Sequence, residues 1–404
     1  MVALNRTTPV RPAAMILIAA MLMSIGLVMV GSATASLDRS LLAPRIWTTP
    51  FGRQAIFMLI GLAIMLLIAR LGRPLLASSS ARARLPIILF VLAVVLLAAA
   101  LVPGLADPHR GSQRWLHLGR FGIGVGFQPS ELAKLALVAF LASLLGERRA
   151  NARSFGRTFL PAALAIGICV GLVGKENFGT AALLACAAGA ILFVAGCRLH
   201  HLLLIVGLGA AGLTFLLFAA PYRLARIAAY QDFWGDPQGA GYQPLQSLVT
   251  IASGGWWGTG LGSGVQKYGY LPESHTDFVF AVLCEELGVF GGALVILLFC
   301  AFVWLGIRTM LVARTRFERL LAFGLTFLVA LQAAMNIAVV TVMTPTTGVP
   351  LPMLSAGGSG LFTVCAAVGL LAAIAHRSLI ENADGMTECA SEARRDREGS
   401  GGTP

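Results

Sequence analysis

The strongest constraint on this chain is a succession of long, continuous apolar runs separated by shorter polar segments. About 20 apolar residues are enough to cross a bilayer as a helix. Only 12% of the 404 residues are charged and 57% are hydrophobic, whereas a soluble domain carries about 25% charge. A membrane β-barrel would need alternating strands of roughly 10 residues. The runs therefore predict an all-α polytopic membrane protein.

About ten transmembrane helices are predicted, and the loops between them define a topology. The spans lie at about 13–33, 54–70, 85–103, 129–146, 158–174, 178–196, 199–220, 277–305, 318–342 and 358–376. With the N-terminus inside, the inner segments hold 19 Lys and Arg, the outer segments hold 10, and Lys134 lies in a span. Because basic residues are retained in the cytoplasm, both termini are predicted to be cytoplasmic. The same bias accounts for the net charge of +12 without a nucleic-acid partner.

Composition divides the chain into three parts. A cytoplasmic N-terminus (1–12) precedes the membrane domain (13–379), and a Glu-, Arg-, Gly- and Ser-rich tail (380–404) is predicted to be disordered. The seven Cys form no CxxC pair, so no metal site and no disulfide framework is expected from them. No internal repeat is visible, so an inverted-repeat transporter gains no support.

The longest connection is an outer loop at about 221–276, between the seventh and eighth spans. It contains the aromatic residues Trp234, Tyr242, Trp256, Trp257, Tyr268 and Tyr270 and few charges. Because aromatic residues gather at lipid headgroups, a folded cap is favoured over disorder. Its segment GTGLGSG (258–264) lacks the strand–helix context of a dinucleotide site, so tight turning and close packing are expected of its glycines.

Ionisable groups inside spans are costly and usually face a cavity or a partner. Glu131 and Lys134 are three residues apart, which places them on one helix face. Two interpretations stay open: a structural ion pair, or a Lys134 cation presented to an anionic ligand and oriented by Glu131. Gln128 and Ser130 flank the Pro that begins this helix and belong to the same candidate site.

The stretch YLPESHTDFVFAVLCEELGVFGG (270–292) concentrates ionisable residues where the eighth span begins. They are Glu273, His275, Asp277, Glu285 and Glu286. The topology places the first three at the outer face, where an acid is stabilised by the exposed N–H groups of the helix. Helix capping by Asp277 alone does not account for the other four.

These polar sets predict an outward-facing cavity. It combines a carboxylate at a helix start with one buried Lys, and Arg114 and Arg120 lie in the outer loop 103–134. Such a site suits an amphiphilic anion at the outer leaflet, and a lipid-linked phosphate fits better than a small soluble ion.

The same segments resemble a known family. They read GLVMVGSAT (26–34), GSQRWLHLG (111–119), FQPSELAK (127–134), FGTA (178–181), QSLVTIASGGWWGTGLGSGVQKYGYLPESHTDFVFAVLCEELGVFG (246–291) and NIAVVTVMTPTTGVPLPMLSAGGSG (336–360). In order and content they are similar to the SEDS family of peptidoglycan glycosyltransferases, which comprises FtsW and RodA. The first segment resembles the FtsW branch more than the RodA branch.

The resemblance implies polymerisation of lipid II into β-1,4 glycan strands at the outer face of the cytoplasmic membrane of a bacterium, in septal wall synthesis. The essential acid of the family corresponds to Asp277, and its Ser-Glu-Leu-Ala-Lys motif corresponds to Glu131 and Lys134. Two motifs depart from the family. Glu176-Asn177 stands where Pro-Asp is usual, which puts a role of that Asp in doubt, and Ala356 replaces a usual Tyr.

A general base must take the proton of an attacking sugar hydroxyl, and Asp277 is the predicted base. Lys134, Arg114 and Arg223 are predicted to stabilise the leaving pyrophosphate. Glu273 and His275 are expected to bind substrate or to position Asp277. No cofactor is firmly implied, although Mg²⁺ or Mn²⁺ could assist at the pyrophosphate.

The expected partners are a class B penicillin-binding protein transpeptidase of the FtsI type, other divisome membrane proteins and membrane lipid. Three other functions stay open. A lipid II flippase would show polar residues reaching both faces, a RodA-like polymerase would serve elongation, and a scaffold would need no ionisable residues inside its spans.

Overall fold

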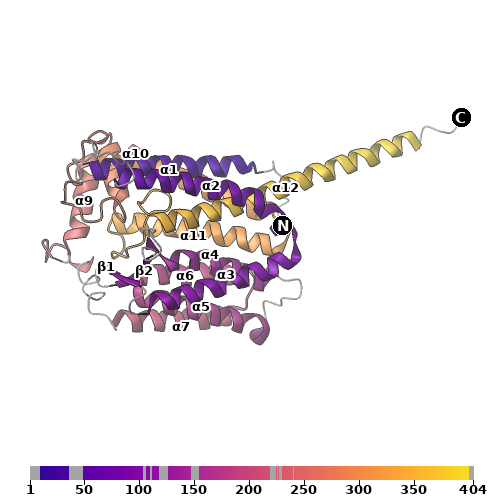
Figure 1. The fold of residues 1–404 in the computed structure, drawn as a ribbon, viewed down its shortest axis with the longest axis horizontal. Coiled ribbons are helices and arrows are strands. Elements are labelled where there is room, and N and C mark those ends of the chain that lie inside the picture. The colour runs from indigo at the N-terminus through magenta and orange to yellow at the C-terminus, as the bar shows by residue number, and fades with distance from the viewer. Residues whose placement is uncertain are drawn as a thin grey trace.

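The computed structural model describes residues 10–35, 49–102, 106–109, 112–117, 126–146, 154–218, 224, 226, 230–239 and 241–399. Its helices are α1 (Pro12–Ala35), α2 (Pro50–Ala77), α3 (Ser79–Ala100), α4 (Pro129–Gly146), the π-helical turn η4 (Phe155–Phe159), α5 (Leu160–Glu176), α6 (Phe178–Val194), α7 (Leu199–Phe218), α9 (Tyr242–Gly254), α10 (Val279–Val312), α11 (Arg316–Val340) and α12 (Gly358–Gly399). They form an elongated bundle of roughly parallel rods (Figure 1). Each predicted span corresponds to one helix of this bundle, and α9 is additional.

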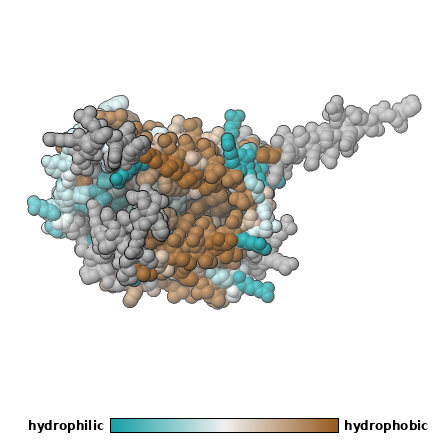
Figure 2. Space-filling view, in the orientation of Figure 1, coloured by the Kyte–Doolittle hydropathy of each residue, from teal (hydrophilic) through white to brown (hydrophobic). Residues whose placement is uncertain are grey.

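Membrane-spanning character follows from length and composition. Eight helices in the described part are long and apolar enough to cross a bilayer, and α6 and the first part of α7 are shorter apolar helices. Hydrophobic residues form a belt around the middle of the visible face, with hydrophilic residues toward both ends (Figure 2). The chain is therefore a multi-pass α-helical membrane protein, as its apolar runs predict.

Local sequence signals start several of these helices. In α2 the Thr49 hydroxyl accepts a hydrogen bond from the N–H of Gly52 at 3.0 Å, and Pro50 occupies the first turn. In α11 Thr315 and Glu318 form a reciprocal capping box. These caps satisfy N–H groups that the helix itself leaves unpaired.

Long-range contacts define the two ends of the bundle. At one end the hydroxyl of Ser32 in α1 donates a hydrogen bond to the carboxylate of Glu286 in α10. At the other, Arg377 of α12 donates to the carbonyl of Leu76 at the end of α2, at 2.6 Å, and also to Glu318. We call the first the outer end and the second the inner end, after the predicted topology.

A small antiparallel sheet lies at the outer end. Its strands are β1 (Ala106–His109), β2 (Ser112–His117) and β3 (Gly126–Phe127), in the order β1-β2-β3. A Cβ on Gly126 would lie 3.0 Å from the Trp115 ring, so glycine lets the two strands approach. The apolar-run pattern contains no signal for this sheet, because its strands are short and lie outside the spans.

The outer loop is folded where the structure describes it. Helix α9 docks on α11 through the Ser247 hydroxyl, which donates to the carbonyl of Val340 at 2.6 Å. Trp256 and Trp257 are strongly exposed and pack on Phe290 of α10, with ring centroids 6.2 and 4.8 Å away. This arrangement is the aromatic cap expected from composition.

The C-terminal segment differs from the predicted disordered tail. The structure continues α12 as a helix to Gly399, and this helix projects beyond the bundle (Figure 1). Residues 380–399 contain no Pro and many Glu, Ala and Arg, which favour helix. The compositional argument underestimated this local propensity.

Candidate functional site

Asp277 lies in a tight turn that immediately precedes α10. The carbonyl of Glu273 accepts hydrogen bonds from the N–H groups of Thr276 (3.1 Å) and Phe278 (3.2 Å). The Glu273 carboxylate accepts the Thr276 hydroxyl at 2.8 Å, and the Glu273 backbone has φ +57°. Glu273 therefore shapes the turn that carries Asp277.

Three successive carbonyls of this turn are held by the segment 341–357 and by α11. The His275 carbonyl accepts from the N–H of Ala356 at 2.9 Å, and the Thr276 carbonyl accepts from the Ser355 hydroxyl at 2.6 Å. The Asp277 carbonyl accepts from the Asn336 amide at 2.8 Å. These bonds fix the backbone of His275, Thr276 and Asp277.

The Asp277 carboxylate is half-buried and faces Gly348. A Cβ on Gly348 would lie 3.6 Å from Oδ2 of Asp277, and Gly348 has φ +68°. The outer-loop residue Arg226 donates to the carbonyl of Thr346, two residues away, at 3.3 Å. A carboxylate and a cation thus lie along the same short segment.

Glu131 and Lys134 form a buried ion pair with Nζ 2.9 Å from Oε2. Lys134 is 2% exposed, and its ammonium also donates to Oε1 of Gln332 at 2.8 Å. The Gln332 amide donates in turn to the carbonyl of Pro350 at 2.9 Å. Lys134 thus pairs with Glu131 within α4 and connects α4 to α11 through Gln332.

Gln332 and Asn336 connect the two candidate groups. They are four residues apart on one face of α11. Gln332 accepts a hydrogen bond from Lys134, and Asn336 donates one to the carbonyl of Asp277. Asn336 also donates to the carbonyl of Val349 at 2.9 Å. Neither was singled out from the sequence, although two amides at i, i+4 in an apolar helix are a recognisable signal of interhelical bonding.

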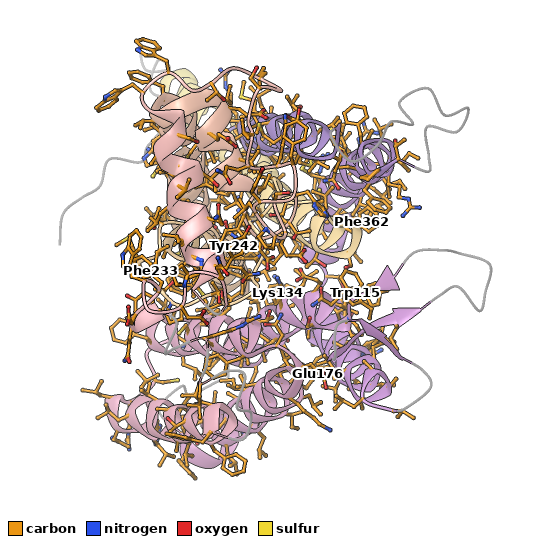
Figure 3. The ribbon with its side chains drawn as sticks, turned by 90° about the vertical axis from the view of Figure 1, so that its left-hand side faces the viewer. Trp115, Lys134, Glu176, Phe233, Tyr242 and Phe362 are labelled. Atoms are coloured by element: carbon orange, nitrogen blue, oxygen red, sulfur yellow. The ribbon has the colours of Figure 1, made fainter. Side chains whose placement is uncertain are left out.

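The remaining predicted residues are placed as follows. Ser130 is buried in the first turn of α4, and Gln128, directly before α4, is half-buried. Arg114 lies in β2, and its side chain is outside the described residues, as are Arg120 and Arg223. Figure 3 views the outer end, with Trp115, Lys134 and Glu176 in the middle of the bundle.

Glu286 belongs to a buried clamp at the outer end. Its carboxylate accepts from the Lys267 ammonium at 2.8 Å and from the Ser32 hydroxyl at 2.6 Å. The adjacent Glu285 accepts the N–H groups of Val265 (2.8 Å) and Gln266 (3.2 Å). The two acids therefore fasten the glycine-rich loop to α1 and α10. Lys267 was not singled out from the sequence, because nothing local links it to Glu286.

Helix α10 is broken at Gly288, which has φ +68° and ψ −169°. The N–H of Val289 donates to the carbonyl of Gly255 at 3.0 Å, and the N–H of Gly260 donates to the carbonyl of Glu286 at 3.0 Å. Segment 255–260 thereby replaces helical hydrogen bonds lost at the break. A Cβ on Gly254 would lie 1.9 Å from a carbonyl oxygen of α10, and a Cβ on Gly258 would lie 2.2 Å from the carbonyl oxygen of Glu286, so close packing requires glycine at both places. Gly258 belongs to the segment 258–264, for which close packing was expected.

Asn177, where the resembled family has Asp, caps α6. Its Oδ1 accepts the N–H of Thr180 at 3.1 Å, and the residue is 5% exposed. An Asn side chain caps as well as Asp does. The departure therefore keeps the cap and removes a negative charge.

Comparisons with known proteins show the family of the chain. The cell cycle protein family of FtsW, RodA and SpoVE matches residues 12–379. The chain is 42% identical over 366 residues to the probable peptidoglycan glycosyltransferase FtsW of Thioalkalivibrio sulfidiphilus, covering 89% of this chain and 88% of the relative. It is 38% identical over 363 residues to stage V sporulation protein E of Bacillus subtilis, covering 88% and 94%.

Solved structures show the same fold. A chain of a peptidoglycan synthase complex, described as coordinating polymerization and crosslinking, superposes with a TM-score of 0.70 at 26% identity, covering 90% of this chain and 97% of that one. The rod-shape-determining protein RodA of Thermus thermophilus superposes with a TM-score of 0.61 at 27% identity, covering 90% and 95%.

Fold and site together define a polytopic membrane protein with a fixed acidic turn at the outer end of its bundle. The chain belongs to the FtsW/RodA/SpoVE family of cell cycle proteins. This is the family that the quoted sequence segments resemble, and the named relatives favour its FtsW branch.

Proposed function

We propose that this protein is a peptidoglycan glycosyltransferase that polymerises lipid II at the outer face of the cytoplasmic membrane, with Asp277 as general base. The observation that carries the proposal is the Asp277 turn. Hydrogen bonds to the main-chain carbonyls of His275, Thr276 and Asp277 hold the turn that carries this half-buried residue at the outer end, in a chain 42% identical to a probable peptidoglycan glycosyltransferase FtsW.

In the proposed reaction the Asp277 carboxylate accepts the proton of the acceptor's sugar 4-hydroxyl as the oxygen attacks the donor's anomeric carbon. The bond from that carbon to the pyrophosphate oxygen breaks, and the configuration inverts to a β-1,4 link. General-base assistance of this kind contributes about 10²–10⁴-fold. Fixing the backbone of the turn supports this role, because a base acts only within hydrogen-bond reach of its proton.

Undecaprenyl pyrophosphate needs no proton to leave if cations stabilise its charge. Arg114 and Arg223 are the proposed cations, and Arg226 joins them because it lies near the segment that Asp277 faces. Lys134 is buried and paired, so we assign it and Glu131 to positioning through Gln332. His275 is proposed to line the sugar site, and Glu273 to hold the turn.

A Mg²⁺ or Mn²⁺ ion at the pyrophosphate is also proposed. No cluster of three His, Cys, Asp or Glu occurs among the described residues. Magnesium bound with substrate phosphates keeps several waters and needs no such cluster. When bound, the ion would neutralise charge on the leaving group.

For its cellular role we propose septal wall synthesis beside a class B penicillin-binding protein of the FtsI type and other divisome membrane proteins. Two observations support this. Several relatives are named FtsW, and one structural neighbour is part of a complex that coordinates polymerization and crosslinking. Imaging of a fluorescent fusion should show the protein at midcell, whereas sidewall labelling would favour a role in elongation.

The deciding experiment combines the protein and its transpeptidase partner in vesicles with labelled lipid II. Asp277→Asn should lower strand formation at least about 100-fold. Asp232→Asn is the matched control. It makes the same change in the exposed outer loop, where Asn can still accept the N–H of Gly235, and it should act like wild type.

Unimpaired polymerisation by Asp277→Asn would eliminate the base role. If wild type makes no strands but moves lipid II across the vesicle membrane, the protein is a flippase and the proposed activity fails.

A further inference from the structure

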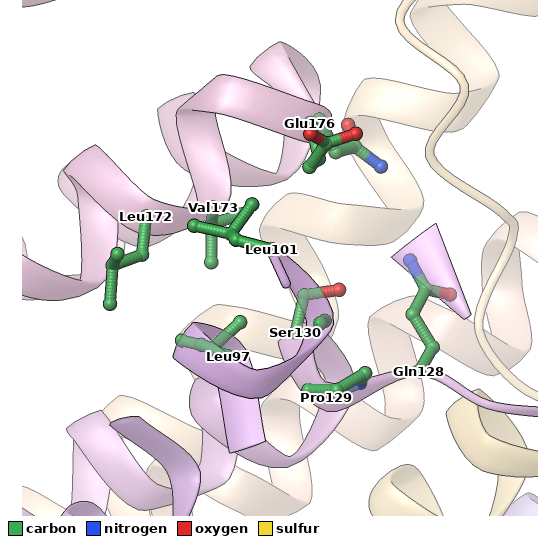
Figure 4. Close-up of a pocket in the computed structure, with 10 residues that line it drawn as sticks. Leu97, Leu101, Gln128, Pro129, Ser130, Leu172, Val173 and Glu176 are labelled. Atoms are coloured by element: carbon green, nitrogen blue, oxygen red, sulfur yellow. The ribbon is translucent and has the colours of Figure 1, made fainter. Parts of the chain in front are cut away.

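The pocket between the outer ends of α3, α4 and α5 holds only a water-sized ligand. Leu97, Ser130 and Val173 line it, and its volume of about 20 Å³ leaves room for about one water molecule (Figure 4). Such a water would accept the Ser130 hydroxyl, which is buried and has no partner among the described residues. A larger ligand would bind at the surface of the bundle, and one corner of the inner end concentrates positive charge there.

That corner is the turn between α2 and α3, at the end of the bundle from which α12 projects (Figure 1). Ser78 is the one residue between the two helices. From one side, Arg377 of α12 donates to the carbonyl of Leu76 at 2.6 Å. From the other side, Ser143 of α4 donates to the carbonyl of Arg82 at 2.9 Å. The backbone of the turn is therefore fixed by its neighbours.

Four Arg surround this turn. Arg70 and Arg73 belong to α2, Arg82 and Arg84 belong to α3, and we call these four residues the basic corner. At 1.5 Å per residue Arg70 lies about 12 Å and Arg84 about 9 Å from Ser78, so both helices carry their cations at similar depth. Arg70 and Arg84 are exposed, and the other two are half-buried. Because the predicted spans end at about 70 and begin at about 85, the basic corner lies at the level of the inner-leaflet headgroups.

The charge of the basic corner is not balanced by an acid. No Asp or Glu occurs in the sequence between Asp38 and Asp107. Glu318 lies close to the turn, because Arg377 bonds both it and Leu76, but its carboxylate already accepts from Arg377 and from N–H groups at the start of α11. Within the described residues the basic corner forms no ion pair. Four like charges close together repel one another, and an anion bound between them would replace repulsion with attraction.

Apolar surface adjoins the basic corner on both helices. From Arg70 on α2 and from Arg84 on α3, exposed apolar side chains continue toward the outer end at helical spacing. They are Leu67 and Leu59 on α2 and Ile88, Val91 and Val95 on α3. These stripes face away from the core, since α2 packs mainly on α12 and α3 mainly on α4. A ligand with an anionic head and long acyl chains would therefore contact more of this surface than a free phosphate.

The guanidinium groups select the kind of headgroup. Arg binds a phosphate through two parallel N–H bonds, and its charge strengthens both. A zwitterionic lipid such as phosphatidylcholine brings its own cation to a place that already has four. Phosphatidylglycerol has the same phosphodiester without that cation, so an anionic phospholipid fits better.

We propose that the basic corner binds the headgroup phosphate of an anionic phospholipid in the inner leaflet, with its acyl chains along the exposed stripes of α2 and α3. The bound phosphate links the ends of two helices that pack mainly on different neighbours, and it stabilises the bundle. The site needs neither lipid II nor Asp277, so it is independent of the proposed glycosyltransferase activity.

The test titrates the purified full-length protein in a non-ionic detergent with phosphatidylglycerol. Native mass spectrometry measures bound lipid, and thermal unfolding measures stability. Wild type should bind phosphatidylglycerol and unfold at a higher temperature, whereas phosphatidylcholine and the water-soluble headgroup glycerophosphoglycerol should have little effect. Arg70→Gln with Arg84→Gln should raise the Kd for phosphatidylglycerol at least about tenfold, because two charge-assisted contacts are lost.

Two matched variants separate this site from general charge and from misfolding. Arg157→Gln with Arg198→Gln removes the same charge from exposed positions elsewhere at the inner end and should leave the Kd unchanged. Arg70→Lys with Arg84→Lys keeps the charge and loses the two-pronged bonds, so its Kd should fall between those of wild type and the Gln variant.

The same Kd in Arg70→Gln with Arg84→Gln as in the Arg157 and Arg198 control would overturn the site. Equal stabilisation by phosphatidylcholine would overturn the selection for an anionic lipid, and equal stabilisation by glycerophosphoglycerol would show a site for free phosphate instead. A Lys variant that binds no better than the Gln variant would also count against the proposal, because retained charge should restore part of the affinity.

Discussion

Asn336 offers the sharpest test of how the acidic turn is held. Its amide nitrogen donates to the carbonyls of Asp277 (2.8 Å) and Val349 (2.9 Å), and the residue is 1% exposed. Asn336→Leu keeps the number of side-chain heavy atoms and removes both bonds. Asn336→Asp keeps the shape and replaces the donor with an acceptor, which then faces two carbonyl oxygens.

The magnitude follows from the two carbonyls left unpaired. Interhelical hydrogen bonds in membrane proteins average about 0.6 kcal/mol and reach about 1.7 kcal/mol. Losing two such bonds should lower the free energy of unfolding of Asn336→Leu by about 1–3 kcal/mol. The free energy of unfolding of Asn336→Asp should fall further. If about 1.4 kcal/mol of this loss comes from misplacing Asp277, strand formation slows tenfold.

The assay is lipid II polymerisation with kcat and KM determined separately, together with thermal unfolding in detergent. For Asn336→Leu kcat should fall about tenfold with KM nearly unchanged, because the base is displaced and the substrate contacts remain. Thr326→Val is the control. This substitution is isosteric and lies in the same helix. It removes a buried hydroxyl that has no partner among the described residues, so the unfolding temperature and kcat should stay unchanged. Full kcat in Asn336→Asp, in a protein that Asp277→Asn inactivates, would refute the reasoning.

Four further outcomes are expected. Lys267→Met leaves the buried charge of Glu286 unpaired and should lower both the unfolding temperature and the stability, the latter by about 3–5 kcal/mol. The double variant Lys267→Met with Glu286→Gln should recover most of the lost stability. Equal unfolding temperatures for the single and double variants would contradict this. Gly254→Ala should destabilise by more than about 2 kcal/mol, whereas Gly189→Ala, whose Cβ meets nothing within 4 Å, should be neutral or stabilising in the same unfolding assay. Asn177→Ala should cost about 1 kcal/mol through loss of the α6 cap and Asn177→Asp close to nothing, so a stability loss in the Asp variant would count against the cap. Chelation of divalent cations should slow strand formation and added Mg²⁺ should restore it; a rate insensitive to the chelator would exclude the proposed ion.

Much of the fold could be predicted from the sequence because membrane insertion is governed by local composition. Each apolar run became a helix, since in lipid a continuous apolar run of this length can bond its whole backbone only as a helix. The three-stranded sheet could not be predicted in this way, because its short strands depend on packing such as that of Trp115 on Gly126. The helical segment beyond residue 380 was missed because its composition favours both disorder and helix.

The candidate site was only partly predictable for a related reason. Asp277 is conspicuous as an acid at the start of an apolar run. Its supports, Asn336 and Ser355, are distant in sequence and chemically ordinary, so only the fold brings them together. The partner of Glu286 was equally invisible, because Lys267 reaches it from a neighbouring loop.

The break at Gly288 also bears on how far the Asp277 turn lies from the hydrocarbon core of the membrane. At 1.5 Å per residue the part of α10 after Gly288 is about 36 Å long, which already matches a hydrocarbon core of about 30 Å. The part before it adds at most on the order of 15 Å beyond that core. With the predicted topology, we infer that the Asp277 carboxylate stands outside the hydrocarbon core, on the side where a lipid-anchored disaccharide would extend into the aqueous phase. Thickening the bilayer would lower the carboxylate toward the phosphates, so the rate of the proposed reaction should depend on acyl-chain length.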